Sequence, residues 1–402
     1  MEEAQRAGVI VGIAAEGGRA EAGEAALAVQ AGLRAAFPDR PGVAVVLTSE
    51  AQDTVEPGGT LVPGDGSRPP PAIHTALGPG AGPALHTLLD VTLAAGAPAC
   101  ALLEPMPRPA DPGWLRALFD PILDGQAELV APAYARRRFD GVLVTGVVYP
   151  LTRALFGQRV LQPLGQEIVI GRRLAEPLAR DDAWRSDAGD GGTHLWALTL
   201  SLMRECRIAQ VILGPRPVPQ AQPPDVSDAL ARVLGTLFRE MEQHASRWQR
   251  VRGSCSVATF GEEHLSSDGP GQAPAPAPLV SSFALGLQDL RRLWSPVLPP
   301  QALYALQRIP REPPEGFRVP DPLWARVVYD FAVGWHVKAM ERQQLLRSMT
   351  PLYLGWVASF VNEVAPLERP EVEARVERLA AAFEAEKPYL ISRWRWPDRF
   401  SP

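Results

Sequence analysis

Polar side chains suited to holding a hydroxyl-rich or anionic ligand are spaced among turn and helix signals between residues 139 and 170. They are Asp140, Arg153, Gln162 and Glu167. Carboxylate, guanidinium and amide groups are planar and bind such ligands through paired hydrogen bonds. We therefore predict that Arg153 and Glu167 face a shared cavity, with Gln162 and Asp140 nearby. The alternative is an ordinary ion pair between Arg153 and Glu167 beside a packed helix.

The elements that must position these residues follow an α/β pattern. Short apolar runs at 8–15, 43–48, 99–103 and 128–132 predict buried strands, and segments 21–37, 84–95 and 114–123 between them predict helices. Strand, helix and strand at this spacing form a right-handed βαβ unit. Ligands of such sheets bind beyond the carboxyl ends of the strands. This rule directs attention to residues 14–18, 48–53 and 104–106 and to the loop after a helix at 195–204.

A glycine-rich turn at residues 78–82 precedes one of these helices. Its backbone N–H groups could cradle a phosphate. It lacks the Lys and the Ser or Thr of a P-loop, so a plain strand-to-helix connection is the alternative.

Composition narrows the class of protein. A chain of 402 residues with 46% hydrophobic residues predicts two globular domains. The net charge of −5 argues against general binding of nucleic acid or anionic lipid. The cysteines, Cys100, Cys206 and Cys255, form no C-x-x-C pair, which disfavours a disulfide framework and a zinc knuckle. Without a signal-peptide pattern or a membrane-length apolar run, we predict a cytoplasmic protein without an integral membrane segment.

The pattern changes to helices beyond residue 220. A long amphipathic helix is predicted at 228–248, and segment 266–278 is rich in Pro, Ala and Gly, as linkers are. Further helices are predicted near 285–294, 324–348, 353–364 and 369–386. We predict an α/β domain at 1–265, a linker at 266–278 and a helical domain at 279–402. Arg and Trp alternate at 393–396, where docking of the tail on the body is favoured over nucleic-acid binding.

The order of segments resembles the GT-A glycosyltransferases, in particular the bacterial retaining enzymes typified by mannosylglycerate synthase and glucosyl-phosphoglycerate synthase. The resemblance covers most of the chain and is carried by the segments 129–134, 140–141, 149–157, 162–165 and 348–355. It implies a Rossmann-like mixed sheet flanked by helices that binds a UDP- or GDP-sugar. It also implies an all-helical C-terminal region that completes the site for a small acceptor.

The resemblance assigns expected roles to individual residues. Catalysis is expected from His194 and Glu167, and the substrate is expected to contact Asp140, Arg153, Gln162, Gly165 and Trp196. Nucleotide binding is expected at Ala14, Glu16, Gly80 and Gly82, and weak metal binding at Glu104. A homodimer and pairing with an active homologue are both left open.

Several positions depart from the family pattern. The acidic D-x-D pair that holds Mg²⁺ or Mn²⁺ is replaced by Glu104-Pro105-Met106, and Val218 stands where an imidazole is expected. Ala81 replaces a lysine, and His194 replaces an acidic residue. The polar turn expected after the first strand is replaced by residues 14–18.

These departures leave two hypotheses. The first is a transferase with weak or metal-independent activity, in which Arg216 or Arg153 neutralises the diphosphate. The second is a non-catalytic relative that serves as a binding or partner scaffold.

Overall fold

The computed structural model describes residues 8–15, 19–40, 43–48, 72–74, 81–103, 111–165, 167–181, 184, 193–215, 225–261 and 273–397. The chain forms two compact units that interleave along the sequence. The α/β unit comprises residues 1–134, 161–219 and 257–265, and the helical unit comprises 135–160, 220–256 and 266–402. The sequence predicts one boundary near residue 265 instead. The difference arises because segments 135–160 and 220–256 pack against the C-terminal helices.

Eight strands of the described chain form one sheet in the order β10-β8-β5-β7-β4-β1-β2-β3. Their bounds are β1 Ile10–Ala15, β2 Val43–Thr48, β3 Ala72–His74, β4 Ala99–Leu103, β5 Leu129–Ala135, β7 Ile168–Gly171, β8 Ile208–Pro215 and β10 Ala258–Gly261. Strand β1 pairs in parallel with β2 and β4, whereas β7 runs antiparallel between β4 and β5. The predicted mixed α/β sheet is confirmed.

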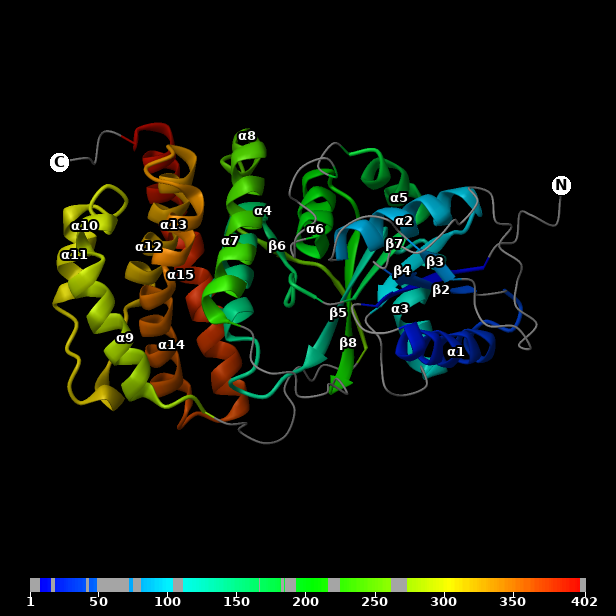
Figure 1. Ribbon diagram of the computed structural model, residues 1–402, viewed down its shortest axis with the longest axis horizontal. Helices are drawn as coiled ribbons and strands as arrows, with labels where there is room; N and C mark the ends of the chain where they lie inside the picture. The colour runs from blue at the N-terminus through cyan, green and yellow to red at the C-terminus, as the bar shows by residue number, and fades with distance from the viewer. Residues whose placement is uncertain are drawn as a thin grey trace. The chain divides into compact units, whose positions relative to one another are not determined.

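Five helices of this unit cover both faces of the sheet. They are α1 Arg19–Ala36, α2 Ala81–Ala94, α3 Pro112–Leu123, α5 Arg172–Ala179 and α6 Thr193–Met203. Helices α1 and α3 lie on one face, and α2, α5 and α6 lie on the other (Figure 1). The sheet is therefore buried on both sides, which explains its nearly continuous apolar strands.

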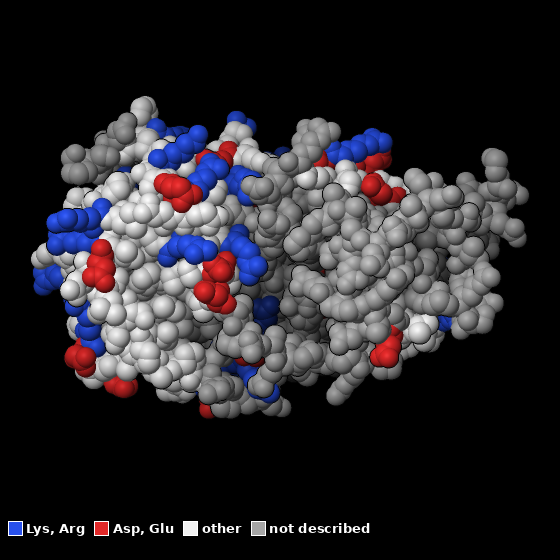
Figure 2. All heavy atoms as spheres, in the orientation of Figure 1, with Lys and Arg blue, Asp and Glu red and all other residues white. Residues whose placement is uncertain are grey.

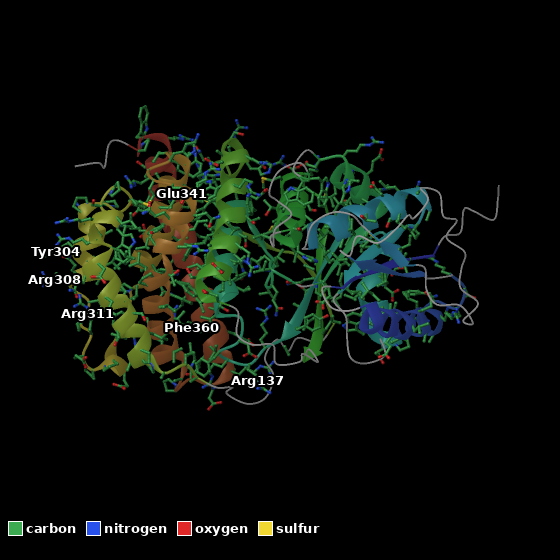
Figure 3. All side chains as sticks on the ribbon, in the orientation of Figure 1. Arg137, Tyr304, Arg308, Arg311, Glu341 and Phe360 are labelled. Atoms are coloured by element: carbon green, nitrogen blue, oxygen red, sulfur yellow. The ribbon has the colours of Figure 1, made fainter. Side chains whose placement is uncertain are left out.

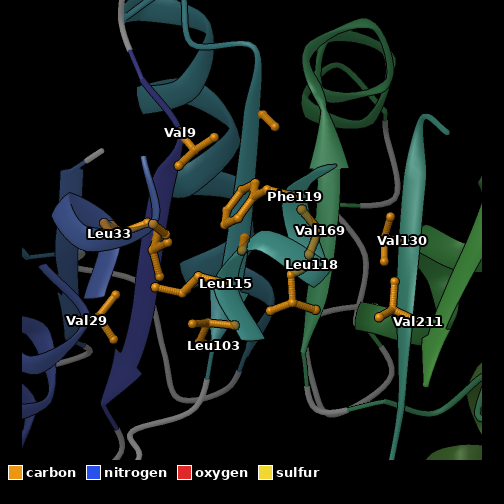
Figure 4. Close-up of a cluster of buried hydrophobic side chains, with 14 of the residues drawn as sticks. Val9, Val29, Leu33, Leu103, Leu115, Leu118, Phe119, Val130, Val169 and Val211 are labelled. Atoms are coloured by element: carbon orange, nitrogen blue, oxygen red, sulfur yellow. The ribbon is translucent and has the colours of Figure 1, made fainter. Parts of the chain in front are cut away.

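The core between the sheet and helices α1 and α3 is built from aliphatic side chains around one phenylalanine. Leu115, Leu118 and Phe119 of α3 are fully buried against strand residues such as Val169 and Leu103 (Figure 4). The spacing of 115, 118 and 119 places the three side chains on one helix face. Ile13 of β1 and Leu103 of β4, near the carboxyl ends of their strands, belong to this core.

The helical unit contains the other helices and two short strands. Their bounds are the π-helix η2 Val144–Val148, α4 Tyr149–Phe156, β6 Gln158–Arg159, α7 Val226–Gln243, α8 Ala245–Trp248, β9 Cys255–Ser256, α9 Pro276–Asp289, α10 Arg291–Trp294, α11 Pro300–Gln307, the 3-10 helix η5 Pro314–Gly316, α12 Asp321–His336, α13 Arg342–Ser348, α14 Thr350–Val364 and α15 Arg369–Arg395. Helix α9 begins inside the predicted linker, with a proline in its first turn, where its missing N–H costs nothing.

Stacked aromatic rings fill the middle of the helical unit. Trp356 lies 5.7 Å from Trp324 and 5.2 Å from Phe360 between ring centroids, and both pairs are nearly parallel. Figure 3 labels Phe360 among the helices of this unit. Gly146 of η2 packs directly beneath Trp356, and its carbonyl oxygen accepts a hydrogen bond of 2.8 Å from Trp324 Nε1. A glycine is needed there because a Cβ atom would overlap the indole ring.

None of the helices in the described part of the chain is both long and apolar enough to cross a bilayer.

Candidate functional site

The carboxyl ends of three parallel strands lie at one edge of the α/β sheet. Ala14 pairs in register with Leu47 near the ends of β1 and β2, and β4 ends at Leu103 beside them. Gly82 lies in the first turn of α2. The predicted nucleotide residues Glu16 and Gly80 and the predicted metal ligand Glu104 fall outside the described residues.

Gln162 connects the segment after β6 to the end of β5. Its amide Nε2 donates to the carbonyl of Tyr134 at 2.6 Å, and its Oε1 accepts from the amide of Tyr134 at 3.2 Å. Both ends of the side chain therefore bind one backbone residue, as a neighbouring strand would. The sequence predicts Gln162 as a substrate ligand, whereas the structure shows its amide already bound to the backbone.

The neighbouring predicted residues lie on the same segment. Gly165 packs closely on backbone carbonyls, with the one from Glu167 3.2 Å from where its Cβ would be. Glu167 is 3% exposed immediately before β7. Gln162 and Glu167 are thus both buried, and Gly165 between them is half-buried.

His194 lies in the first turn of α6. Its Nε2 is buried and has no hydrogen-bond partner. Burial lowers the pKa of His194 to about 4, because removing the imidazolium from water disfavours the charged form. The imidazole is therefore neutral at pH 7, and one ring nitrogen keeps a lone pair that can accept a proton.

Aromatic rings surround the same helix. Trp196 is buried and packs edge-on against Trp184 at 4.5 Å, and His86 of α2 lies 4.9 Å from the other side of Trp184. The indole N–H of Trp184 donates to the carbonyl of Leu178 at 2.6 Å. His194 and Trp196 thus both lie on α6, but they are two positions apart, and side chains at this spacing do not face each other.

Two threonines of α6 also have unsatisfied hydroxyl groups. Thr193 and Thr199 are 1% and 0% exposed, and the Oγ1 atom of each has no partner. Buried polar atoms usually have a partner. The sequence did not predict these unpartnered hydroxyl groups, because the hydroxyl of a Thr in an apolar helix ordinarily donates to a carbonyl of the preceding turn.

Arg153 is held by carboxylates within the helical unit. It is 4% exposed, and its Nη1 and Nε lie 2.6 and 3.0 Å from Glu377 and Glu384 of α15. Nη1 also donates to the Tyr149 hydroxyl at 3.2 Å. The hydroxyl of Tyr149 donates in turn to Glu377 at 2.7 Å, so the groups form one closed network. The partners of Arg153 are thus two glutamates more than 200 positions away, which no local pattern could identify.

Asp140 caps a turn in the helical unit. Its Oδ2 accepts from the backbone amide of Arg137 at 3.3 Å, and Gly141 follows with a φ of +66°. A glycine suits this position, since glycine adopts positive φ without a Cβ clash. Figure 3 shows the side chain of Arg137 at the lower margin of this unit.

A divalent metal is poorly matched to the donor set that the sequence offers. One carboxylate at Glu104, with a thioether at Met106 and an aliphatic side chain at Val218, lacks the oxygen ligands that Mg²⁺ and Mn²⁺ prefer. These three positions lie outside the described residues. Within the described ranges, no three His, Cys, Asp or Glu side chains gather as a metal site would require.

Comparison with known proteins gives likenesses among solved structures. No family model and no curated protein matches the chain. Glucosyl-3-phosphoglycerate synthase from Mycobacterium tuberculosis, in complex with phosphoglyceric acid, is similar at 21% identity and a TM-score of 0.44, over 60% of this chain and 81% of that one. The same enzyme with Mn²⁺, uridine-diphosphate and phosphoglyceric acid is similar at 24% identity and a TM-score of 0.42, over 59% and 79%.

Proposed function

We propose that this protein transfers a sugar, with retention of configuration, from a UDP- or GDP-sugar to a small hydroxyl-bearing acceptor. The family-like segments of the sequence and the mixed sheet with parallel β1, β2 and β4 support a nucleotide subsite at the carboxyl edge. In this proposal that subsite includes Ala14, Glu16, Gly80 and Gly82, and the sugar and acceptor contact Gly165, Glu167 and Trp196.

The observation that carries the proposal is the neutral, unpartnered Nε2 of His194. With its proton on Nδ1, the ring accepts a hydrogen bond from the acceptor hydroxyl at Nε2. That proton passes to His194 as the hydroxyl oxygen bonds to the anomeric carbon from the same face that the nucleoside diphosphate leaves, so the configuration is retained. A pKa near 4 makes this imidazole a weak base, so slow turnover is expected.

Gln162 and Arg153 serve this function as positioning residues. Gln162 fixes the turn that carries Gly165 and Glu167, and Arg153 ties α4 to α15. A non-catalytic binding scaffold is the second candidate. Gln162 and Arg153 support this second candidate, because their polar groups already bind other groups of the protein instead of a substrate.

The two candidates differ in turnover. Nucleoside diphosphate release should be measured with UDP-glucose and GDP-mannose as probe donors, together with the melting temperature with UDP and GDP. His194→Ala should lower turnover by about 100-fold, the usual scale for losing an acid–base group. His86→Ala in the same unit serves as the matched control and should keep most of the turnover. Nucleotide-dependent stabilisation without turnover at any pH would favour the scaffold. If the nucleotides neither stabilise the protein nor are released by turnover, both candidates are rejected.

A further inference from the structure

The outer edge of the helical unit carries an unusual concentration of arginine. Arg291, Arg292, Arg308 and Arg311 are the only charged residues between positions 291 and 311. The chain as a whole has a net charge of −5. We call these four residues, with Tyr304, the arginine edge. The exposed carboxylates Asp289, Glu312 and Glu315 flank these residues in the sequence.

The arginine edge is exposed along α10, α11 and the turn that follows. Tyr304 is 59% exposed, and Arg291, Arg292 and Arg308 are exposed as well. Figure 3 shows Tyr304, Arg308 and Arg311 in a row at the outer margin of the helical unit. Figure 2 shows basic side chains on the same margin, with acidic side chains among them. No carboxylate of the described residues lies within ion-pair distance of any of the four arginines.

Two of the guanidinium groups are held in place by their neighbours. Arg308 lies over the Tyr304 ring, 5.4 Å from its centroid, and its Nη1 donates to the Tyr304 hydroxyl at 2.8 Å. Arg311 Nη2 donates to the carbonyl of Gln307 at 3.3 Å, and its Nε is buried without a partner. A guanidinium that is already oriented loses less entropy when it binds a planar anion.

These features fit a protein partner better than other anionic ligands. Exposed Tyr and oriented Arg are the residue types that dominate protein–protein binding energy. A fluid lipid surface requires no fixed guanidinium orientation and favours protruding apolar side chains, whereas the Tyr304 ring is covered on one face by Arg308.

We propose that the arginine edge docks an acidic protein segment, whose carboxylates pair with Arg308 and Arg311 and whose apolar side chains cover Tyr304. Glutamate and aspartate side chains match the planar fork of each guanidinium. The arginine edge belongs to the helical unit and shares no residue with the proposed sugar-transfer site.

The test uses the full chain and a fluorescein-labelled peptide that alternates Glu and Leu. Fluorescence anisotropy should show binding that weakens with added salt, because the contacts are exposed charge pairs. The double variant Arg308→Gln/Arg311→Gln and the single variant Tyr304→Ala should each bind about tenfold more weakly, the scale of losing an interface hot spot. The double variant Arg250→Gln/Arg252→Gln is the matched control, since both residues are exposed arginines of the same unit. It should bind as the parent chain does.

Three further measurements identify the occupant. They are binding to a Lys-Leu peptide, to a single-stranded oligonucleotide, and to vesicles of phosphatidylcholine with phosphatidylglycerol. The proposal is overturned if the acidic peptide does not bind, if it binds equally to all variants, or if only the oligonucleotide or the vesicles show dependence on Arg308 and Arg311. Salt-sensitive self-association in sedimentation, lost in the Arg308→Gln/Arg311→Gln variant, would make a second copy the occupant and would also overturn it.

Discussion

The ammonium group of Lys387 donates to the carbonyl oxygen of Ala154 at 2.6 Å. It also donates to the carbonyls of Leu155 at 3.4 Å and Val251 at 3.0 Å, so one lysine of α15 closes the carboxyl end of α4. Helix carboxyl ends leave carbonyl groups without partners and attract positive charge. Lys387 is only 6% exposed, and its position explains why α4 belongs to the helical unit.

Lys387→Met should destabilise the protein at pH 7 by about 2 kcal/mol, because it leaves these buried carbonyls without their donor. Urea unfolding followed by circular dichroism measures the change. Lys338→Met is the control, because Lys338 is exposed and should change stability by less than about 0.5 kcal/mol. An unchanged unfolding midpoint in Lys387→Met would contradict this prediction.

Stability should also rise with pH because of Lys387. Burial lowers its pKa to about 8, with a further lowering from Arg252 and an opposing effect from Glu384. Between about pH 8 and the unfolded value of 10.5, the unfolded chain binds more protons, so raising the pH favours the folded state. The gain should approach about 3 kcal/mol. The free energy of unfolding of the parent and of Lys387→Met is measured across that pH range, and the difference between the two removes the contribution of other titrating groups. A difference that does not change with pH would count against the prediction.

Arg153→Met should destabilise the helical unit by about 3 kcal/mol, since it leaves Glu384 and Glu377 near each other without their cation. Burial raises the pKa of Glu377, but hydrogen bonds from Tyr149 and Arg153 lower it overall, so the variant should lose less stability than the parent as the pH falls through the carboxylate range. Arg180→Met is the control, because Arg180 forms an exposed pair with Glu176 and should cost less than about 0.5 kcal/mol. Equal effects of the two variants on the free energy of unfolding would show that the Arg153 network contributes little to stability.

Gly146→Ala should cost at least about 2 kcal/mol, because its Cβ would overlap the Trp356 ring inside a packed aromatic stack. Gly235→Ala on α7 provides the matched control. Its Cβ would lie 3.4 Å from Leu346 Cδ1, an ordinary contact, so alanine there should be neutral or stabilising by up to about 1 kcal/mol. Near-equal unfolding midpoints of the two variants would refute the packing argument.

The pKa of His194 predicts acid sensitivity. Burial lowers it from 6.5 to about 4, so between these values the unfolded chain binds more protons than the folded one. Stability contributed by the neutral imidazole is therefore complete above about pH 6.5 and is lost as the pH falls toward 4. His194→Gln should show a shallower loss of stability over this range in urea titrations. Parallel pH profiles of the two proteins would be inconsistent with a buried neutral imidazole.

Mn²⁺ should not tighten the binding of UDP or GDP appreciably, because Glu104, Met106 and Val218 offer one hard ligand where several are needed. Isothermal titration calorimetry with and without Mn²⁺ measures this. A tenfold gain in affinity, about 1.4 kcal/mol, would disprove it. Met106→Asp/Val218→His should create metal-dependent binding, and a folded double variant that ignores Mn²⁺ would show that the missing ligands lie elsewhere.

Local patterns in the sequence determined the secondary structure of the α/β unit. Strands β2 Val43–Thr48 and β4 Ala99–Leu103 coincide with the predicted runs, because a short apolar run between turn signals has few other buried conformations. Gly157 ends α4 with a φ of +72°, a conformation that glycine adopts readily. These features depend on residues that are adjacent in the sequence, so the local sequence specifies them.

Only the tertiary structure decided which unit each segment joins and which groups each polar side chain meets. The sequence placed residues 135–160 with the sheet, yet Arg153 and Ala154 bind α15 through Glu377 and Lys387. These pairings join positions more than 200 residues apart and have no periodic signature. Likewise, the identity of His194 could be read from the sequence, but its neutral state could not. That state follows from desolvation, which exists only once α6 is packed into the fold.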